Sequence, residues 1–165
     1  MTTSKTVMSH IWAPWRMKYI KENSNNDDCP FCLAFADSDD SGNLVVFRGK
    51  NALVMLNRYP YTSGHLLVLP DVHRERLSDF DQETRTEMTE LVNRAGEVLG
   101  IIYQPEGLNI GINIGEAAGA GIPKHLHWHI VPRWVGDTNY ITTVGETRVL
   151  PESLEDTYQK INSSW

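Results

Sequence analysis

The chain has 165 residues, of which 41% are hydrophobic and 22% charged, and its 15 basic and 21 acidic residues give a net charge of −6. These values are typical of a globular protein that is long enough for one domain with a buried core. The acidic balance argues against a protein that binds bulk nucleic acid or an anionic membrane through a basic face, but it does not exclude a local patch of donors for a small polyphosphate. We therefore expect neither a nucleic-acid polymer nor a membrane as a partner.

The amino-terminal part gives no sign of a targeting or membrane segment. No apolar run approaches the roughly 18 residues that would span a bilayer, and residues 1–16 lack the continuous apolar stretch of a signal peptide. We therefore expect a cytoplasmic protein. The first predicted element is a short helix over residues 12–22, with Pro14 in its first turn, where the missing N–H is tolerated.

Three strands are predicted next. The β-type runs 44–47 and 52–56 are separated by Gly49-Lys50-Asn51, which is typical of a hairpin turn. A third strand over residues 65–69 is followed by Pro70, which cannot continue a hydrogen-bonded ladder.

A long helix follows these strands. Ser78 or Asp79 is its expected cap, apolar residues recur at helical spacing to about Leu99, and Gly100 is expected to end it. Two more strands are expected over residues 108–114 and 126–131, and a last amphipathic helix over residues 152–161.

The order of these elements predicts the fold class. The connections between strands are short or hairpin-like, which favours a mostly antiparallel sheet. The long helix would cover one face of this five-stranded sheet, which makes the protein an α+β domain.

The chemistry is concentrated in the segment that contains His125, His127 and His129. Side chains alternate between the two faces of a strand, so these three residues would share one face. Leu126, Trp128 and Ile130 would share the other face and pack against the helix. A chance cluster on a solvated strand is the less favoured interpretation, because three histidines alternate strictly beside a glycine-rich loop.

Two functional interpretations of the histidines remain open at this point. Imidazoles two residues apart on a strand are about 7 Å apart at their Cα atoms, which lets them share a zinc ion. Alternatively, an imidazole nitrogen attacks phosphorus and forms a phosphoramidate that a second acceptor resolves. The nearby stretch 113–121 offers Asn113 and flexible glycine N–H groups, which form anion-binding concavities and favour a phosphate ligand facing the histidines.

The histidine row and its neighbours resemble a known family. His125-x-His127-x-His129, followed by two apolar residues, is similar to the motif of the histidine-triad (HIT) family, and the segment from Leu56-Asn57 to Gly64-His65 resembles the family's first conserved block. The flanks 11–16 and 139–141 resemble the bacterial branch that contains diadenosine tetraphosphate phosphorylases and related hydrolases.

The resemblance covers roughly residues 29–134. We therefore expect one HIT-like domain over residues 1–165, with residues 29–134 as its core, a helical extension over 1–28, and a segment with a helix over 135–165. The resemblance implies a five-stranded antiparallel sheet and a homodimer that pairs through the long helix and the sheet edge.

The same resemblance implies roles for single residues. His127 would be the nucleophile that forms a nucleotidyl-histidine, His129 would hydrogen-bond the phosphate, and His65 would support it. Asn57 matches a ribose-contacting position and Asn113 a phosphate-contacting one. The remaining nucleotide-binding positions are Ala120, Gly121, Ile122 and Pro123. The first three would wrap the α-phosphate with backbone N–H groups, and Pro123, which has no N–H, would contribute shape only.

The pair Cys29 and Cys32 adds a second candidate site. Two thiolates supply half of the four ligands that zinc prefers. In galactose-1-phosphate uridylyltransferases and several small bacterial HIT proteins, such a pair binds zinc with a histidine after the third strand and the first triad histidine. The resemblance thus implies a structural zinc held by Cys29, Cys32, His73 and His125; two buried free thiols are the alternative.

The predicted function is therefore cleavage of dinucleoside polyphosphates such as diadenosine tetraphosphate, with phosphate or water as acceptor and a slight preference for phosphate. Three alternatives stay open. They are a nucleoside phosphoramidate hydrolase with the same nucleophile, a nucleotide-binding or scaffold protein without catalysis, and a hydrolase that uses a catalytic metal.

Overall fold

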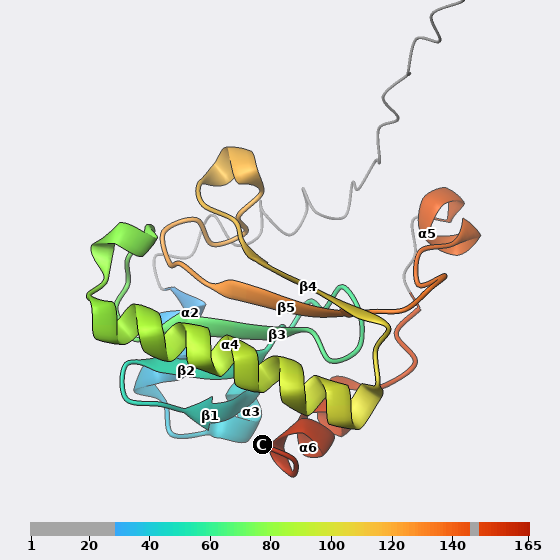
Figure 1. The fold of residues 1–165 in the computed structure, drawn as a ribbon, viewed down its shortest axis with the longest axis horizontal. Helices are drawn as coiled ribbons and strands as arrows, with labels where there is room; N and C mark the ends of the chain where they lie inside the picture. Colours follow the sequence, from blue (N-terminus) through green and yellow to red (C-terminus); the bar gives the residue numbers. More distant parts are fainter. Residues whose placement is uncertain (1–28, 146–148) are drawn as a thin grey trace, which may run out of the picture.

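The computed structural model describes residues 29–145 and 149–165, and within them five strands form one antiparallel sheet in the order β1-β2-β3-β5-β4 (Figure 1). The predicted helix over residues 12–22 lies outside the described residues. The predicted α+β class and the five-stranded antiparallel sheet are confirmed. The strands are β1 (Val45–Arg48), β2 (Ala52–Leu56), β3 (Leu66–Pro70), β4 (Gly107–Ile112) and β5 (Trp128–Arg133).

The two central strands are buried on both faces. Every residue of β2 and β3 is buried, and the two strands pair without a register shift, from Ala52 opposite Pro70 to Leu56 opposite Leu66. Alternate side chains enter two separate cores. One core contains Val54 and Val68 together with α4, and the other contains Leu53 and residues of α2. Because both faces of these strands are buried, their sequences are continuously apolar instead of alternating.

The long helix α4 (Gln82–Tyr103) lies across one face of the sheet, as predicted (Figure 1). Its predicted ends were wrong. The cap is Asp81, whose carboxylate accepts a hydrogen bond from Thr84 N at 2.8 Å, whereas the predicted caps Ser78 and Asp79 lie in a preceding 3₁₀ turn, η1 (Leu77–Asp79). The capping carboxylate satisfies a backbone N–H that has no partner within the helix.

The predicted stop at Gly100 was also wrong. The helix continues through Gly100 because Ile102 and Tyr103 still pack against the core, which offsets the cost of one glycine in a helix. It ends only at Gln104, which has a φ of 44° in the left-handed region.

The hairpin between β1 and β2 forms where the sequence predicts it. Gly49 N donates to Ala52 O, and the N–H groups of Lys50 and Asn51 donate to the Glu87 carboxylate on α4 at 2.7 and 3.0 Å. A Cβ atom at position 49 would lie 2.9 Å from the carbonyl oxygen of Ala52 and 2.0 Å from a Glu87 oxygen; the backbone contact cannot move aside as the Glu87 side chain can, which favours glycine here.

The first strand also holds a short helix against the second face of the sheet. The guanidinium of Arg48 donates to the carbonyls of Ala34 and Asp37 at 2.8 and 2.7 Å and to the Asp40 carboxylate at 2.8 Å. These carbonyls lie at the carboxyl end of helix α2 (Pro30–Ala36), where a cation is favoured. Arg48 therefore fixes α2 in place. Neither α2 nor the one-turn helix α3 (Asp40–Asn43) was predicted.

Other predicted boundaries shift as well. β1 and β3 each move by one residue, and the prediction that the third strand stops before Pro70 was wrong, because Pro70 is the last residue of β3 and pairs with Ala52. β4 ends at Ile112 instead of residue 114. β5 begins at Trp128 instead of residue 126, because Leu126 N donates to Arg74 O in a loop instead of to a strand. The last helix is α6 (Leu154–Asn162), because Ser153 caps it and residue 152 precedes it.

The carboxyl-terminal part contains α6 and the short helix α5 (Tyr140–Val144), which lies beyond the end of β5 (Figure 1). Ile161 of α6 is fully buried in the core that α4 covers. In the described part of the chain, no helix has the length and hydropathy needed to cross a bilayer. The division of the chain into extension, core and C-terminal segment stays a prediction.

Replacing Arg48 with Ala is expected to lower the free energy of unfolding by about 2 kcal/mol, because several carbonyls and a carboxylate lose a shared charged donor. Urea unfolding followed by circular dichroism measures this loss. Arg94→Ala is the matched control, since its exposed pair with Glu97 should contribute less than about 0.5 kcal/mol. Equal effects of the two substitutions would contradict the role assigned to Arg48.

Candidate functional site

The ring of His125 is fully buried between the sheet and α2. Its Nε2 lies 2.9 Å from the carbonyl oxygen of Pro70, the last residue of β3. A carbonyl only accepts, so Nε2 carries the proton and donates it. Burial is the main cause that lowers the pKa of His125 to about 4, which keeps the ring neutral. The lone pair therefore stands on Nδ1, on the other side of the ring.

This Nδ1 faces the cysteine pair. It lies 3.5 Å from Cys29 Sγ and 3.6 Å from Cys32 Sγ, and His73 Nδ1 lies 3.2 Å from Cys32 Sγ. A tetrahedral zinc with its usual bond lengths places sulfur and nitrogen ligands about 3.5 Å apart. The observed separations match this value, and the four ligand atoms all lie within 4.8 Å of one another. The four predicted ligands therefore come together in a set that fits zinc.

The second histidine of the row, His127, is 6% exposed, and its ring is held by a main-chain carbonyl two residues earlier. Its Nδ1 lies 2.8 Å from the carbonyl oxygen of His125, so Nδ1 is the protonated nitrogen. Burial lowers the pKa of His127, against the opposite effect of this hydrogen bond, so the ring is neutral at pH 7. The lone pair of His127 is consequently on Nε2, and this nitrogen can act as a nucleophile.

The third histidine is oriented by a directed chain of hydrogen bonds. Tyr61 N–H donates to His65 Nδ1 at 3.1 Å, so neutral His65 carries its proton on Nε2. That nitrogen lies 3.0 Å from His129 Nδ1 and donates to it. His129 in turn carries its proton on Nε2, where it can donate to a ligand.

The site thus pairs a nucleophile with a donor. The rings of His127 and His129 are 4.8 Å apart between centroids, and the first offers a lone pair while the second offers N–H. The alternation of faces across the row is confirmed, since Leu126, Trp128 and Ile130 pack in the core that α4 covers. However, His125 and His127 precede β5 instead of lying in it.

The glycine-rich loop provides fewer donors than its composition suggests. The N–H groups of Ala118, Gly119 and Ala120 bond to carbonyls within the loop, around the 3₁₀ turn η2 (Glu116–Ala118). By contrast, the N–H groups of Gly121 and Ile122 make no hydrogen bond within the described residues. Both residues belong to the predicted phosphate-binding set. Of the backbone donors predicted there, these two are the ones left for a phosphate.

The two predicted asparagines differ in their surroundings. Asn113 follows β4, and its amide makes no hydrogen bond within the part of the chain that the structure describes. Asn57 is engaged: its Oδ1 accepts from Tyr59 N at 2.9 Å, and its Nδ2 lies 3.3 Å from His65 Nδ1. Asn57 thus supports the histidine chain, and its contact with a ribose stays a prediction.

Two residues of the site were not predicted. Phe31, between the two cysteines, presents its ring to His125 and His127 at centroid distances of 5.4 and 5.0 Å. Tyr61 contributes its N–H to His65 and its ring to His129, 6.0 Å away. The position of Phe31 inside the cysteine motif was an available signal, whereas no sequence signal marks a backbone donor.

A buried imidazole with an outward lone pair beside an N–H donor, on an antiparallel sheet covered by one long helix, defines a class of nucleophilic histidine proteins. The HIT domain model matches residues 39–135, and the chain belongs to the HIT family. It is an enzyme of the histidine-triad type, a nucleotidyltransferase or hydrolase.

Three similar proteins illustrate this membership. The AP-4-A phosphorylase of Mycobacterium tuberculosis is 37% identical over 96% of this chain and 85% of that protein. The asymmetrical bis(5'-nucleosyl)-tetraphosphatase of Schizosaccharomyces pombe is 33% identical over 58% of this chain and 52% of that protein. The structure of a Zn-bound histidine triad family protein from Mycobacterium smegmatis matches with a TM-score of 0.66 at 28% identity, over 83% of this chain and 92% of that one.

The proton positions can be measured directly. Long-range ¹H–¹⁵N correlation spectra at pH 7 should show His127 as the Nδ1–H tautomer and His129 as the Nε2–H tautomer, because their partners are a carbonyl and a donating imidazole. The variants His127→Asn and His129→Asn assign the signals. An Nε2–H tautomer at His127 would remove the nucleophile and contradict the arrangement.

Proposed function

We propose that this enzyme cleaves dinucleoside polyphosphates, with diadenosine tetraphosphate as the representative substrate, through a nucleotidyl intermediate on His127. The observation that carries the proposal is the opposite protonation of two adjacent rings, a lone pair on His127 Nε2 and a proton on His129 Nε2. The printed names of the two enzyme relatives, both of which refer to such substrates, support the choice of substrate.

In the first step, His127 Nε2 attacks the α-phosphorus and forms a P–N bond. The bond from phosphorus to the bridging oxygen breaks, and ATP leaves from the tetraphosphate. The imidazole becomes positive, and the His125 carbonyl, 2.8 Å from Nδ1, stabilises that charge. His129 donates to a non-bridging oxygen, where negative charge develops.

In the second step, an oxygen of inorganic phosphate or of water attacks the same phosphorus. The P–N bond breaks, its electron pair returns to His127 Nε2, and the product is ADP or AMP. Two easier displacements thus replace one difficult displacement. The backbone donors of Gly121 and Ile122, with Asn113, would hold the phosphate, Ala120 and Pro123 would shape that loop, and Asn57 would contact the ribose.

Phosphate is the preferred acceptor because the relative that matches almost the whole chain is named a phosphorylase. A nucleoside phosphoramidate hydrolase is the second candidate, because the same nucleophile would attack an AMP–amine bond. Comparing turnover of an adenosine phosphoramidate with turnover of the tetraphosphate separates the two. A scaffold role without catalysis would instead leave the cellular function intact in His127→Asn.

The central test is the intermediate. Brief incubation with diadenosine tetraphosphate without phosphate, followed by alkaline quenching, should give an AMP adduct on His127 by mass spectrometry. His127→Asn should reduce turnover by at least about 10³-fold, because the nucleophile is removed. With phosphate added, ADP should form from the wild-type enzyme. AMP as the product with and without phosphate would contradict the phosphorylase preference, and turnover without any adduct would contradict the mechanism.

We also propose that Cys29, Cys32, His73 and His125 hold a structural zinc ion. Three separations between ligand atoms, of 3.2 to 3.6 Å, are close to those of a tetrahedral site, and all four atoms lie within 4.8 Å of one another. The bond from His125 Nε2 to Pro70 O is the second-sphere contact that orients a metal-binding imidazole. Because His127 is outside this set, its nucleophilic nitrogen is left for the substrate. Thiolate ligands also fit a reducing compartment, in support of a cytoplasmic location.

Elemental analysis should find about one zinc per chain in protein purified without added metal. Cys32→Ser should lose the metal and more than about 2 kcal/mol of stability, because binding to the folded state contributes to folding. Leu33→Ala, an exposed change on the same helix, should retain both. The absence of zinc together with unchanged stability in Cys32→Ser would contradict the site. Slow loss of activity on chelation indicates a structural ion, and immediate loss a catalytic one.

A homodimer is the assembly that we propose. The edge strand β4 is largely exposed, and Ile110 on it and Ile101 on α4 are 46% and 68% exposed. An unpaired edge beside apolar side chains favours pairing with a second copy of the chain.

A further inference from the structure

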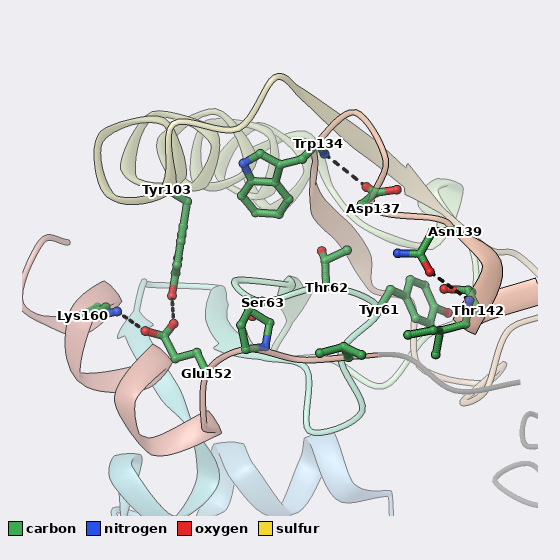
Figure 2. A pocket seen from close by; sticks show the side chains of 13 residues that line it. Tyr61, Thr62, Ser63, Tyr103, Trp134, Asp137, Asn139, Thr142, Glu152 and Lys160 are labelled. Carbon is green, nitrogen blue, oxygen red and sulfur yellow. Dashed lines mark hydrogen bonds and ion pairs between the residues drawn. The ribbon is translucent and has the colours of Figure 1, made fainter. Parts of the chain in front are cut away.

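A cavity of about 520 Å³ lies at the end of the sheet where β5 stops (Figure 2), and no residue of the metal cluster lines it. Its walls come from four segments: the loop between β2 and β3, the end of α4, residues 134–142 after β5, and residues 149–160 before and within α6. Its volume is in the range of small-molecule sites. None of the triad histidines lines it, and Tyr61 is the residue that it shares with the histidine site.

Three of the 13 residues that line the cavity are aromatic. Tyr61, Tyr103 and Trp134 face the cavity, and the rings of the last two meet edge to face at 6.5 Å. Figure 2 shows Trp134 and Tyr103 on one side of the space and Ser63 on the other. Flat aromatic rings of this kind are suited to stacking on a heterocycle.

The carboxylates of the cavity are already neutralised. Asp137 accepts from Arg133 at 2.6 and 2.8 Å, while Glu152 pairs with Lys160 and accepts from the hydroxyl of Tyr103. These partners leave no unpaired carboxylate for a cationic ligand. The space is therefore suited to a neutral, flat molecule instead of an ion.

A polar atom is also available for such a molecule. The Oγ atom of Ser63 is buried and has no hydrogen-bond partner within the described chain. A buried hydroxyl without a partner is costly, and a ligand edge with donors and acceptors would satisfy it. Aromatic rings in the wall together with such a hydroxyl fit a nucleobase.

The position of the cavity suggests which of the two nucleosides of the substrate it would bind. The Tyr61 ring packs against His129 at 6.0 Å on one side and lines the cavity on the other. Trp134 lies five residues after His129, which is about 16 Å along an extended chain. From an α-phosphorus at the histidines, the three remaining phosphates and the distal ribose of an extended substrate cover a comparable length.

We propose that this cavity binds the distal nucleoside of the dinucleoside polyphosphate, the half that leaves in the first step. This inference rests on the proposed function and assigns the enzyme's preference for dinucleotides to a site outside the histidine triad. Trp134 is then a specificity residue, because stacking there strengthens binding only of substrates that carry a second base.

The test compares two substrates that share the same α-phosphorus, diadenosine tetraphosphate and adenosine tetraphosphate, which lacks the second nucleoside. The measured quantity is the ratio of their kcat/KM values, which does not depend on the fraction of folded enzyme. Trp134→Leu should lower this ratio by on the order of tenfold, since one stacking contact is lost. Thr142→Trp, which fills the cavity from α5, should lower it similarly.

Phe47→Leu is the control, since Phe47 stacks on Trp165 at the distant edge strand β1, and it should leave the ratio at the wild-type value. A wild-type ratio near one, or a ratio that either cavity variant leaves unchanged, would overturn the inference while the proposed function stands. Wild-type enzyme that cleaves neither substrate would instead show that the proposed function itself is wrong.

Discussion

The site depends on a single hydrogen bond, from His127 Nδ1–H to the main-chain carbonyl of His125. This bond decides which nitrogen of His127 keeps its lone pair. The residue that supplies the carbonyl also sends its own side chain into the Cys29–Cys32 cluster and anchors it on Pro70. One residue therefore belongs to both centres, with its ring in the cluster and its backbone against the nucleophile. Any change that moves His125 must disturb both.

The two faces of the sheet have different tasks. The face under α4 contains the large apolar core and holds Trp128 and Ile130 of β5 in register. The opposite face is covered by α2, which contains Phe31 and Cys32 and is preceded by Cys29 at its N-cap. Arg48 ties the end of α2 to β1. The helix is therefore held to the sheet at two points, by the Arg48 hydrogen bonds at its carboxyl end and by the metal-ligand cluster at its amino end.

The sequence was sufficient for the parts of the fold that follow period and charge. Strict alternation placed Leu126, Trp128 and Ile130 in one core, and the apolar runs 52–56 and 65–69 predicted two strands that the structure contains. The sequence was not sufficient to place the ends of a helix where several residues give equally good cap or stop signals. Ser78, Asp79 and Asp81 are all good caps, and only tertiary packing selects Asp81. Gly100 is a stop signal by propensity, yet the packing of Ile102 and Tyr103 overrides it.

The candidate site divides in the same way. The four metal-binding candidates and the triad are side chains whose identity is visible in the sequence, and the structure brings each set together. The protonation pattern depends on the carbonyls of Pro70 and His125 and on the N–H of Tyr61, and main-chain groups have no sequence signature. The cavity beside Tyr61 was not predicted either, because its walls come from four separate segments.

The amide at position 61 has a consequence for the side chain of the same residue. The positions of the protons on His65 and His129 are set by the main-chain N–H of residue 61, and every amino acid except proline has such a group. The ring at this position can therefore be replaced without removing the donor to His65, and the polarity of the histidines is then kept by the shape of the loop and not by a side chain.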